Sequence, residues 1–223
     1  MANRTIGKTR RKRAPRPLSR KESKLVTRNR LLEAGLALLA EGGYEELTTG
    51  RVARRAGVAQ PTFYVHFHDR DELLAALAAE TIGKIRGALR EVRLQIAHGG
   101  DVLGLTRETF RLPLAAIAEH GDLLRLFVSE LHRRHSAFGK AARALVAELT
   151  ADLVEDLRTI GFVEKATRES LSLIAETVIM LTIHFGLAYV DRRRRDLDAL
   201  ADLLTRTTLT LLLEATERDA APA

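Results

Sequence analysis

The chain has 223 residues, 46% of them hydrophobic, a length that suits one compact domain with a smaller one attached. It has no cysteine, which excludes disulfides, thiolate metal sites and cysteine nucleophiles, and is typical of the reducing cytoplasm. The net charge is +7, yet residues 1–30 hold twelve Lys or Arg against one acidic residue, Glu22, so residues 31–223 carry −4.

Residues 1–24 are predicted to form a basic, disordered arm. The segment has two prolines and no apolar periodicity, and its arginines include Arg10, Arg11 and Arg13. It lacks the apolar run of a secretory signal. Because clustered Arg and Lys release counterions from phosphates, and arginine suits a narrow minor groove, the arm is predicted to follow DNA. The alternative is a solubilising or cloning-derived tail.

The next residues predict a first helix of about eighteen residues. Leucines recur at helical spacing until Gly42-Gly43, which ends the segment; they are Leu25, Leu31, Leu32, Leu36 and Leu39. This helix is expected to pack under two short helices that follow it.

Residues 47–74 have the pattern of helix, glycine turn, short helix and capped long helix. Thr48 is a good N-cap, and Gly57 allows a second helix to cross the first. The first short helix has a small apolar face, and the inward positions after the turn belong to Val58, Phe63 and Phe67. The outward positions then belong to Gln60, Thr62, Tyr64 and His66.

This pattern resembles the TetR family of bacterial transcriptional regulators over about residues 27–75. The matching residues are Thr48, Val52-Ala53, Ala56-Gly57-Val58, Tyr64-Val65-His66-Phe67, and Arg70 with Leu73. Two positions depart from the family: Thr49 replaces an aliphatic residue, and Ala59 replaces the Ser or Thr that usually caps the second short helix. The weaker cap costs about 1 kcal/mol.

The outward residues are predicted to contact DNA. Gln60 and Thr62 suit base edges, while Tyr64 and His66 suit phosphates and Arg70 adds charge. The full predicted set is Thr48, Thr49, Arg51, Gln60, Pro61, Thr62, Tyr64, His66 and Arg70, joined by Arg10, Arg11 and Arg13 from the arm. The DNA-binding domain is placed at residues 25–75.

The remainder, residues 76–223, is predicted to be an all-α ligand-binding and dimerisation domain. A fourth helix starts at Asp69, where Glu72 completes the form of a capping box, and runs to Gly99-Gly100. Further helices are expected at about 102–118, 122–134, 137–160, 166–190 and 196–217, with a kink or break at Pro113. The resemblance implies that the last two helices form a homodimer interface.

The apolar run Leu171 to Val190 carries Glu176 and His184, so a buried helix is favoured over a membrane span.

The effector is the least determined part of the prediction. The lining is expected to contain Phe110, Phe127, Phe138 and Phe185, with Arg125, Arg133 and Arg134 near the entrance to meet a charged head group. An apolar lining suits a long apolar ligand better than a flat polycationic drug. The stretch Ile96 to Val102, with Thr109-Phe110 and Ser136 to Phe138, also resembles the FabR and DesT repressors of unsaturated fatty acid synthesis, which implies a fatty acid or acyl-CoA.

Other classes of function have weaker support. His132 and His135 stand at i, i+3 but lack a third ligand, so no metal or other cofactor is expected. The sequence contains no nucleophile elbow, phosphate loop or catalytic carboxylate pair, so an enzyme is not predicted. A multidrug-type sensor on the same scaffold and a ligand-independent nucleic-acid-binding scaffold remain as alternatives. The predicted protein is a cytoplasmic repressor that binds a palindromic double-stranded operator.

Overall fold

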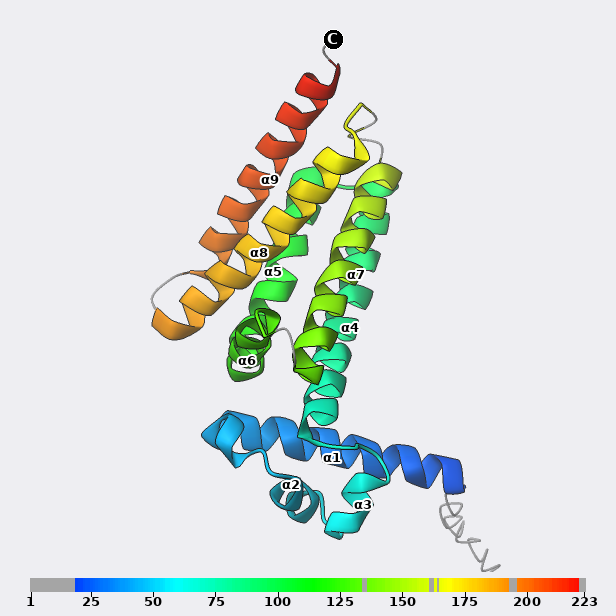
Figure 1. Cartoon of the computed structure of the whole chain (residues 1–223). Coiled ribbons are helices and arrows are strands. Elements are labelled where there is room, and N and C mark those ends of the chain that lie inside the picture. The colour runs from blue at the N-terminus through cyan, green and yellow to red at the C-terminus, as the bar shows by residue number, and fades with distance from the viewer. Residues whose placement is uncertain (1–18, 134–135, 161–162, 164, 193–195, 221–223) are drawn as a thin grey trace, which may run out of the picture.

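The computed structural model describes residues 19–133, 136–160, 163, 165–192 and 196–220, and all regular structure in these ranges is helical. The N-terminal part comprises α1 (Arg20–Gly42), the 3-10 turn η1 (Tyr44–Glu46), α2 (Thr49–Arg55) and α3 (Gln60–Tyr64). The long helix α4 (Arg70–Ala97) rises from it into the C-terminal bundle of α5 (Val102–Glu119), α6 (Gly121–Leu131), α7 (Ala137–Ile160), α8 (Arg168–Arg192) and α9 (Leu197–Ala220) (Figure 1). The predicted all-α fold is confirmed.

Helix α1 begins five residues before the expected start at Leu25. Ser19 caps it: the Glu22 backbone N–H donates to the Ser19 hydroxyl at 3.2 Å, and the Ser19 N–H donates to the Glu22 carboxylate at 2.6 Å. Residues 20–24, which the sequence predicted to belong to the arm, are therefore helical. The lone acidic residue among the first thirty is the residue that closes this cap.

The N-terminal domain packs around the aromatic rings that follow the glycine turn. Phe63 and Phe67 are fully buried with Val52 and Leu47, and Gly57 adopts a φ of +72°, as a tight turn between crossing helices requires. Helices α2 and α3 lie on the side of α1 that faces away from the C-terminal bundle (Figure 1). The outer surface of these two short helices is thus open to a partner.

The start of α4 differs slightly from the expected capping box. Asp69 accepts the Glu72 N–H at 2.9 Å, but the Glu72 carboxylate accepts from His68, at 2.6 Å, and not from Asp69. The hydrogen bond from Glu72 also lowers the pKa of Asp69, because it favours the charged carboxylate. The backbone at His68 and the side chain of Asp69 are therefore both hydrogen-bonded to Glu72 in the first turn of α4.

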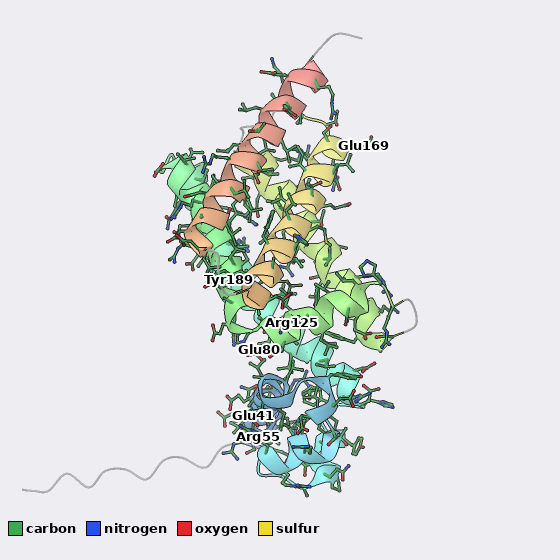
Figure 2. The ribbon with its side chains drawn as sticks, turned by 90° about the vertical axis from the view of Figure 1, so that its left-hand side faces the viewer. Glu41, Arg55, Glu80, Arg125, Glu169 and Tyr189 are labelled. Atoms are coloured by element: carbon green, nitrogen blue, oxygen red, sulfur yellow. The ribbon has the colours of Figure 1, made fainter. Side chains whose placement is uncertain are left out.

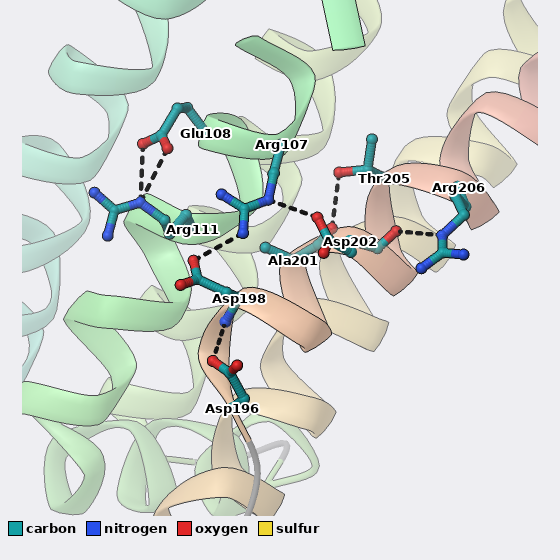
Figure 3. Close-up of polar contacts among 9 residues, drawn as sticks. All are labelled: Arg107, Glu108, Arg111, Asp196, Asp198, Ala201, Asp202, Thr205 and Arg206. Atoms are coloured by element: carbon teal, nitrogen blue, oxygen red, sulfur yellow. Dashed lines mark hydrogen bonds and ion pairs between the residues drawn. The ribbon is translucent and has the colours of Figure 1, made fainter. Parts of the chain in front are cut away.

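The C-terminal bundle is joined by ion pairs that cross between helices. Arg107 of α5 contacts Asp198 at 3.0 Å and Asp202 at 2.5 Å, both on α9 (Figure 3). Arg125 of α6 contacts Asp191 of α8 at 2.7 Å. The helix is not broken at Pro113. Although proline has no backbone N–H to donate to the preceding turn, α5 continues past it to Glu119.

Within the part of the chain that the structure describes, one helix, α8, has the length and apolar character that a membrane span requires, over residues 168–191. Core helices of soluble bundles share these properties, and α8 packs against α5, α7 and α9. Its most buried side chains, Leu171, Ala175 and Val178, belong to the C-terminal core with Leu200 and Leu204 of α9.

Candidate DNA-binding surface and ligand cavity

The exposed face of α2 and α3 carries a connected group of polar side chains. The Gln60 amide donates to the Thr49 hydroxyl at 3.2 Å, and that hydroxyl lies 3.2 Å from the Tyr64 hydroxyl. Tyr64 is 54% exposed although its neighbour Phe63 is fully buried. The three polar groups are therefore presented together, with their side chains oriented before any DNA is bound.

The structure gives several predicted contact residues a second role. Thr48 caps α2 by accepting the Arg51 N–H at 3.3 Å, and Arg51 itself forms an ion pair with Glu46. Arg70 stacks on the Tyr44 ring, with its guanidinium carbon 4.1 Å from the ring centroid. A phosphate must compete with Glu46 for Arg51. On α3, Gln60 and Pro61 are exposed and Thr62 is half-buried.

His66 lies at the edge of this surface in a partly buried position. Burial lowers the pKa of His66, and the positive charges of Lys24 and Arg28 lower it further, which favours the neutral imidazole. Its Nδ1 has no hydrogen-bond partner among the residues that the structure describes.

Two basic residues of α1, Lys24 and Arg28, lie beside His66 and were not among the predicted contact residues. Arg28 donates to the His66 carbonyl at 3.0 Å and stacks over Phe67, with the guanidinium carbon 4.3 Å from the ring centroid. Lys24 lies one turn earlier, near His66. In the sequence, only the i, i+4 spacing of Lys24 and Arg28 indicates that they share a helix face. Their proximity to His66 could not be predicted, because Arg28 and His66 are 38 residues apart. Arg10, Arg11 and Arg13 lie outside the described residues.

Arg55 shows how intramolecular ion pairs shape this domain. It contacts Glu41 of α1 at 2.7 Å, and Figure 2 shows the two residues side by side. Both side chains are exposed, so the pair contributes little stability. It does hold the end of α2 against α1.

A cavity of about 370 Å³ lies within the C-terminal bundle. It is lined almost entirely by aliphatic side chains from α4 to α9, with Phe110, Pro113 and Phe127 in its wall. On α4 the lining runs from Ile82 to Ile96, which at 1.5 Å per residue spans about 21 Å. The volume lies in the range of small-molecule sites, and the shape along α4 is long.

The structure corrects the expected lining of this cavity. Phe138 is buried instead in the N-terminal core, where its ring meets Phe127 at a centroid distance of 6.3 Å, and Phe185 packs on the C-terminal core. Arg125 of α6 (Figure 2) pairs with Asp122 of its own helix and with Asp191 near the end of α8. Arg133 pairs with Glu130 at 3.1 Å, and Arg134, like His135, lies outside the described residues. Arg125 and Arg133 are engaged by nearby carboxylates, and neither side chain lines the cavity.

The cavity and the DNA-binding domain share side chains. Phe127 of α6 is 3% exposed, belongs to the N-terminal core and lines the cavity. Leu124 and Ile82 pack on the same core and also line the cavity. A change in the cavity therefore acts directly on the packing beneath α1.

Comparison with known proteins agrees with this geometry. Residues 31–77 match the family model for bacterial regulatory proteins of the tetR family. The chain carries a TetR-family DNA-binding domain. The match covers α2, α3, the turn between them and the start of α4, so the surface of Thr49, Gln60 and Tyr64 is the surface of a TetR-family helix-turn-helix.

Solved structures extend the likeness to the C-terminal bundle. The chain is 20% identical to the fatty acid degradation regulator FadR from Bacillus halodurans (TM-score 0.66, covering 82% of this chain and 94% of that one). It is 25% identical to Thermus thermophilus FadR, a TetR-family repressor in complex with lauroyl-CoA (TM-score 0.63; 88% and 98%). A putative TetR-family regulator from Syntrophomonas wolfei is 18% identical (TM-score 0.68; 84% and 95%). The fold of the whole chain is that of TetR-family transcriptional regulators.

Proposed function

We propose that the protein is a homodimeric repressor that binds a palindromic operator through α2 and α3 and responds to a long-chain acyl ligand in the C-terminal cavity. The observation that carries the proposal is the TetR-family domain with its exposed group of Thr49, Gln60 and Tyr64. Gln60 and Thr62 face base edges in the major groove, and Tyr64 and His66 contact phosphates. We assign no catalytic role to any residue, and the site of action is DNA in the cytoplasm.

The dimer forms through α8 and α9. These helices lie side by side along one side of the bundle (Figure 1), and each exposes large apolar side chains: Leu173 and Met180 on α8, and Leu203 and Leu213 on α9, the last of which also lines the cavity. Exposed apolar groups on neighbouring helices are typical of protein interfaces. A twofold dimer places two copies of α3 on two half-sites, which is the reason such operators are palindromic.

The composition of the cavity favours a long aliphatic ligand. An acyl chain gains about 0.8 kcal/mol for each buried methylene, and a lining of Ile and Leu along α4 provides this burial. A flat aromatic cation needs acidic or aromatic walls. Here the described residues provide the aromatic rings of Phe110 and Phe127 and one acid, Asp156, whose charge is already paired with Arg93. The lauroyl-CoA held by the Thermus thermophilus repressor supports the same ligand class.

Coupling to DNA proceeds through the side chains that the cavity shares with the N-terminal core. A ligand that displaces Phe127 or Leu124 must repack the surface beneath α1, and α4 carries any shift of its upper half to Asp69 and α3. The spacing of two half-sites is fixed by the duplex, so a small change in the separation of the two α3 helices lowers affinity.

An operator selected from a random duplex library provides the test. Fluorescence anisotropy should show that saturated fatty acids or their CoA thioesters release the protein, with potency that rises from C8 to C16. Sedimentation of the ligand-free complex should give two chains per duplex. Indifference to chain length, with release by aromatic cations alone, would replace the acyl ligand by a multidrug-type one. Equal affinity for all duplexes would indicate a nonspecific scaffold.

A further inference from the structure

Two charged side chains interrupt the apolar wall of the cavity. On α4 the lining positions are Ile82, Ile85, Leu89, Arg93 and Ile96, so Arg93 occupies a place in an aliphatic stripe. On α7 the lining positions are Leu149, Leu153, Asp156 and Leu157. Arg93 Nη1 donates to Asp156 Oδ2, which places both interruptions at one level of the cavity.

A second arginine on the same helix shows that this pair is not needed to join α4 to α7. Arg86 contacts Asp152 and Glu148 of α7, each at 2.7 Å. The side chain of Arg86 is 33% exposed, whereas that of Arg93 is 15% exposed and faces the cavity. The ion pairs of Arg86 thus already join α4 to α7. They lie nearer to water than the Arg93 pair, so their charges lose less hydration.

The Arg93 pair is costly where it stands. Removing charged groups from water carries a desolvation cost, and well-packed apolar residues in their place often give equal or greater stability. Leucine would continue both stripes. A charged pair at these positions is therefore poorly explained by stability and better explained by a ligand.

The pair is also asymmetric in a way that favours an anionic ligand. A guanidinium has five N–H groups and cannot lose its proton, and the described residues provide Arg93 with one carboxylate oxygen as acceptor. Asp156 is more exposed, at 29%, and can turn toward water without leaving a buried charge unpaired. A ligand carboxylate can thus take the place of Asp156 on Arg93, while a cation in the same place would face the fixed charge of Arg93.

We infer that Arg93 is the head-group anchor of the cavity and selects ligands that end in a carboxylate, with Asp156 as the internal anion that the ligand's carboxylate displaces. The inference rests on the proposed acyl ligand and makes it more specific: the preferred form is the free fatty acid, because the thioester of an acyl-CoA presents a neutral carbonyl to Arg93. The aliphatic chain then extends along α4 toward Ile82 and Phe127, where the cavity meets the N-terminal core.

The experiment measures ligand binding without DNA, by isothermal titration calorimetry on the full chain. Three C12 probes differ only in their head groups: dodecanoate, dodecan-1-ol and dodecylamine. The wild-type protein should bind dodecanoate more tightly than dodecan-1-ol by roughly tenfold or more, as charge-assisted hydrogen bonds imply. Arg93→Met should abolish this preference and leave affinity for the alcohol within about threefold. Asp156→Asn should strengthen binding of dodecanoate, because the competing anion is gone.

Arg86→Met is the matched control, since it also removes an α4–α7 ion pair but leaves the cavity wall intact; it should keep the preference for dodecanoate. Arg93→Lys retains the positive charge and should therefore keep part of the preference for dodecanoate that Arg93→Met loses. This comparison separates recognition of the charge from an effect on folding. The inference is overturned if Arg93→Met weakens all three probes equally, if Arg86→Met has the same effect, or if the wild-type protein does not distinguish acid from alcohol. Binding of neither the acid nor the alcohol would instead remove the acyl ligand from the proposed function, while operator binding through α2 and α3 would be unaffected.

Discussion

At the scale of single residues, the hydrogen bond between Gln60 and Thr49 links sequence recognition to the local fold. The bond is solvent-exposed and 3.2 Å long, so the Gln60 amide can exchange Thr49 for an adenine edge at small cost. Gln60→Ala should relax base preference at one or two operator positions by about 1–3 kcal/mol. Titration of single-mismatch duplexes at one fixed salt concentration measures this change.

Tyr64→Phe is the matched control for that substitution. It removes a hydroxyl from the same polar group but, if Tyr64 contacts a phosphate, it should weaken binding to all duplexes alike. A loss of preference at one base pair in Tyr64→Phe, with none in Gln60→Ala, would exchange the roles of the two residues.

The hydroxyl of Thr208 gives a prediction about stability. Helical threonines of α9 usually donate to the carbonyl four residues earlier, as Thr205 does to Ala201 at 2.7 Å, whereas the buried Thr208 hydroxyl has no partner among the described residues and lies in the cavity wall. An unsatisfied buried hydroxyl costs about 1–3 kcal/mol, so Thr208→Val should raise the free energy of unfolding by about 1 kcal/mol. Thr205→Val, which loses a hydrogen bond, should lower it by a similar amount. Urea unfolding of both variants checks the contrast; equal losses would show that the Thr208 hydroxyl is satisfied in solution.

At the scale of elements, the bundle depends on one close approach between α5 and α8. A Cβ atom added at Gly186 would lie 2.6 Å from Cδ1 and 2.8 Å from Cγ2 of Ile117, whose β-branched side chain cannot turn away freely. Gly186→Ala should therefore destabilise the protein by about 1–3 kcal/mol. Ile117 also lines the cavity, so the same variant should reduce ligand binding.

Gly83→Ala is the control for this packing effect. Gly83 lies inside α4 with no atom within 4 Å of an added Cβ, so the substitution should stabilise the protein by about 0.5–1 kcal/mol through the unfolded chain. Opposite shifts of the urea midpoint in the two variants are expected. A stabilised Gly186→Ala variant would mean that α5 and α8 can separate without cost.

The elements differ in how well the sequence alone predicts them. The helix-turn-helix was predictable to its inward residues, because Gly57, Phe63 and Phe67 fix the turn and the buried face within one local segment. The start of α1 was missed because the apolar pattern begins at Leu25, while the cap that starts the helix is the polar pair Ser19 and Glu22. The start of α1 is thus indicated by the capping residues Ser19 and Glu22 and not by the spacing of apolar residues.

The cavity was less predictable because its wall is assembled from six helices. Phe110 and Phe127 line it and Phe138 and Phe185 do not, a distinction that depends on how each of the helices α5 to α8 is oriented in the bundle and not on residue type. Arg125 and Arg133 were expected near the ligand but are paired with Asp191 and Glu130. Arg93 was visible in the sequence as one charge within an aliphatic stripe, but its partner Asp156 is 63 residues away and only the fold brings them together.

At the scale of the whole molecule, charge is distributed unevenly and this predicts how binding depends on salt. Residues 1–17 hold seven Lys or Arg and no acidic residue, and they precede Ser19, which caps α1. Deleting residues 1–17 keeps the cap, so the thermal midpoint should not change. The slope of log affinity against log salt should become shallower by several units for a dimer, at about 0.9 for each lost phosphate contact.

Replacement of Arg10, Arg11 and Arg13 by lysine separates charge from groove recognition in the same arm. The three lysines keep the charge, so the salt slope should stay near that of the wild-type protein, whereas any preference for A·T-rich flanks should fall because a narrow minor groove favours the guanidinium. Anisotropy titrations across a salt series, on operators with A·T-rich and G·C-rich flanks, measure both quantities at once. If deletion of the arm leaves the slope unchanged, the arm does not contact DNA and all phosphate contacts belong to the helical domain, where Lys24 and Arg28 of α1 are then the next residues to test.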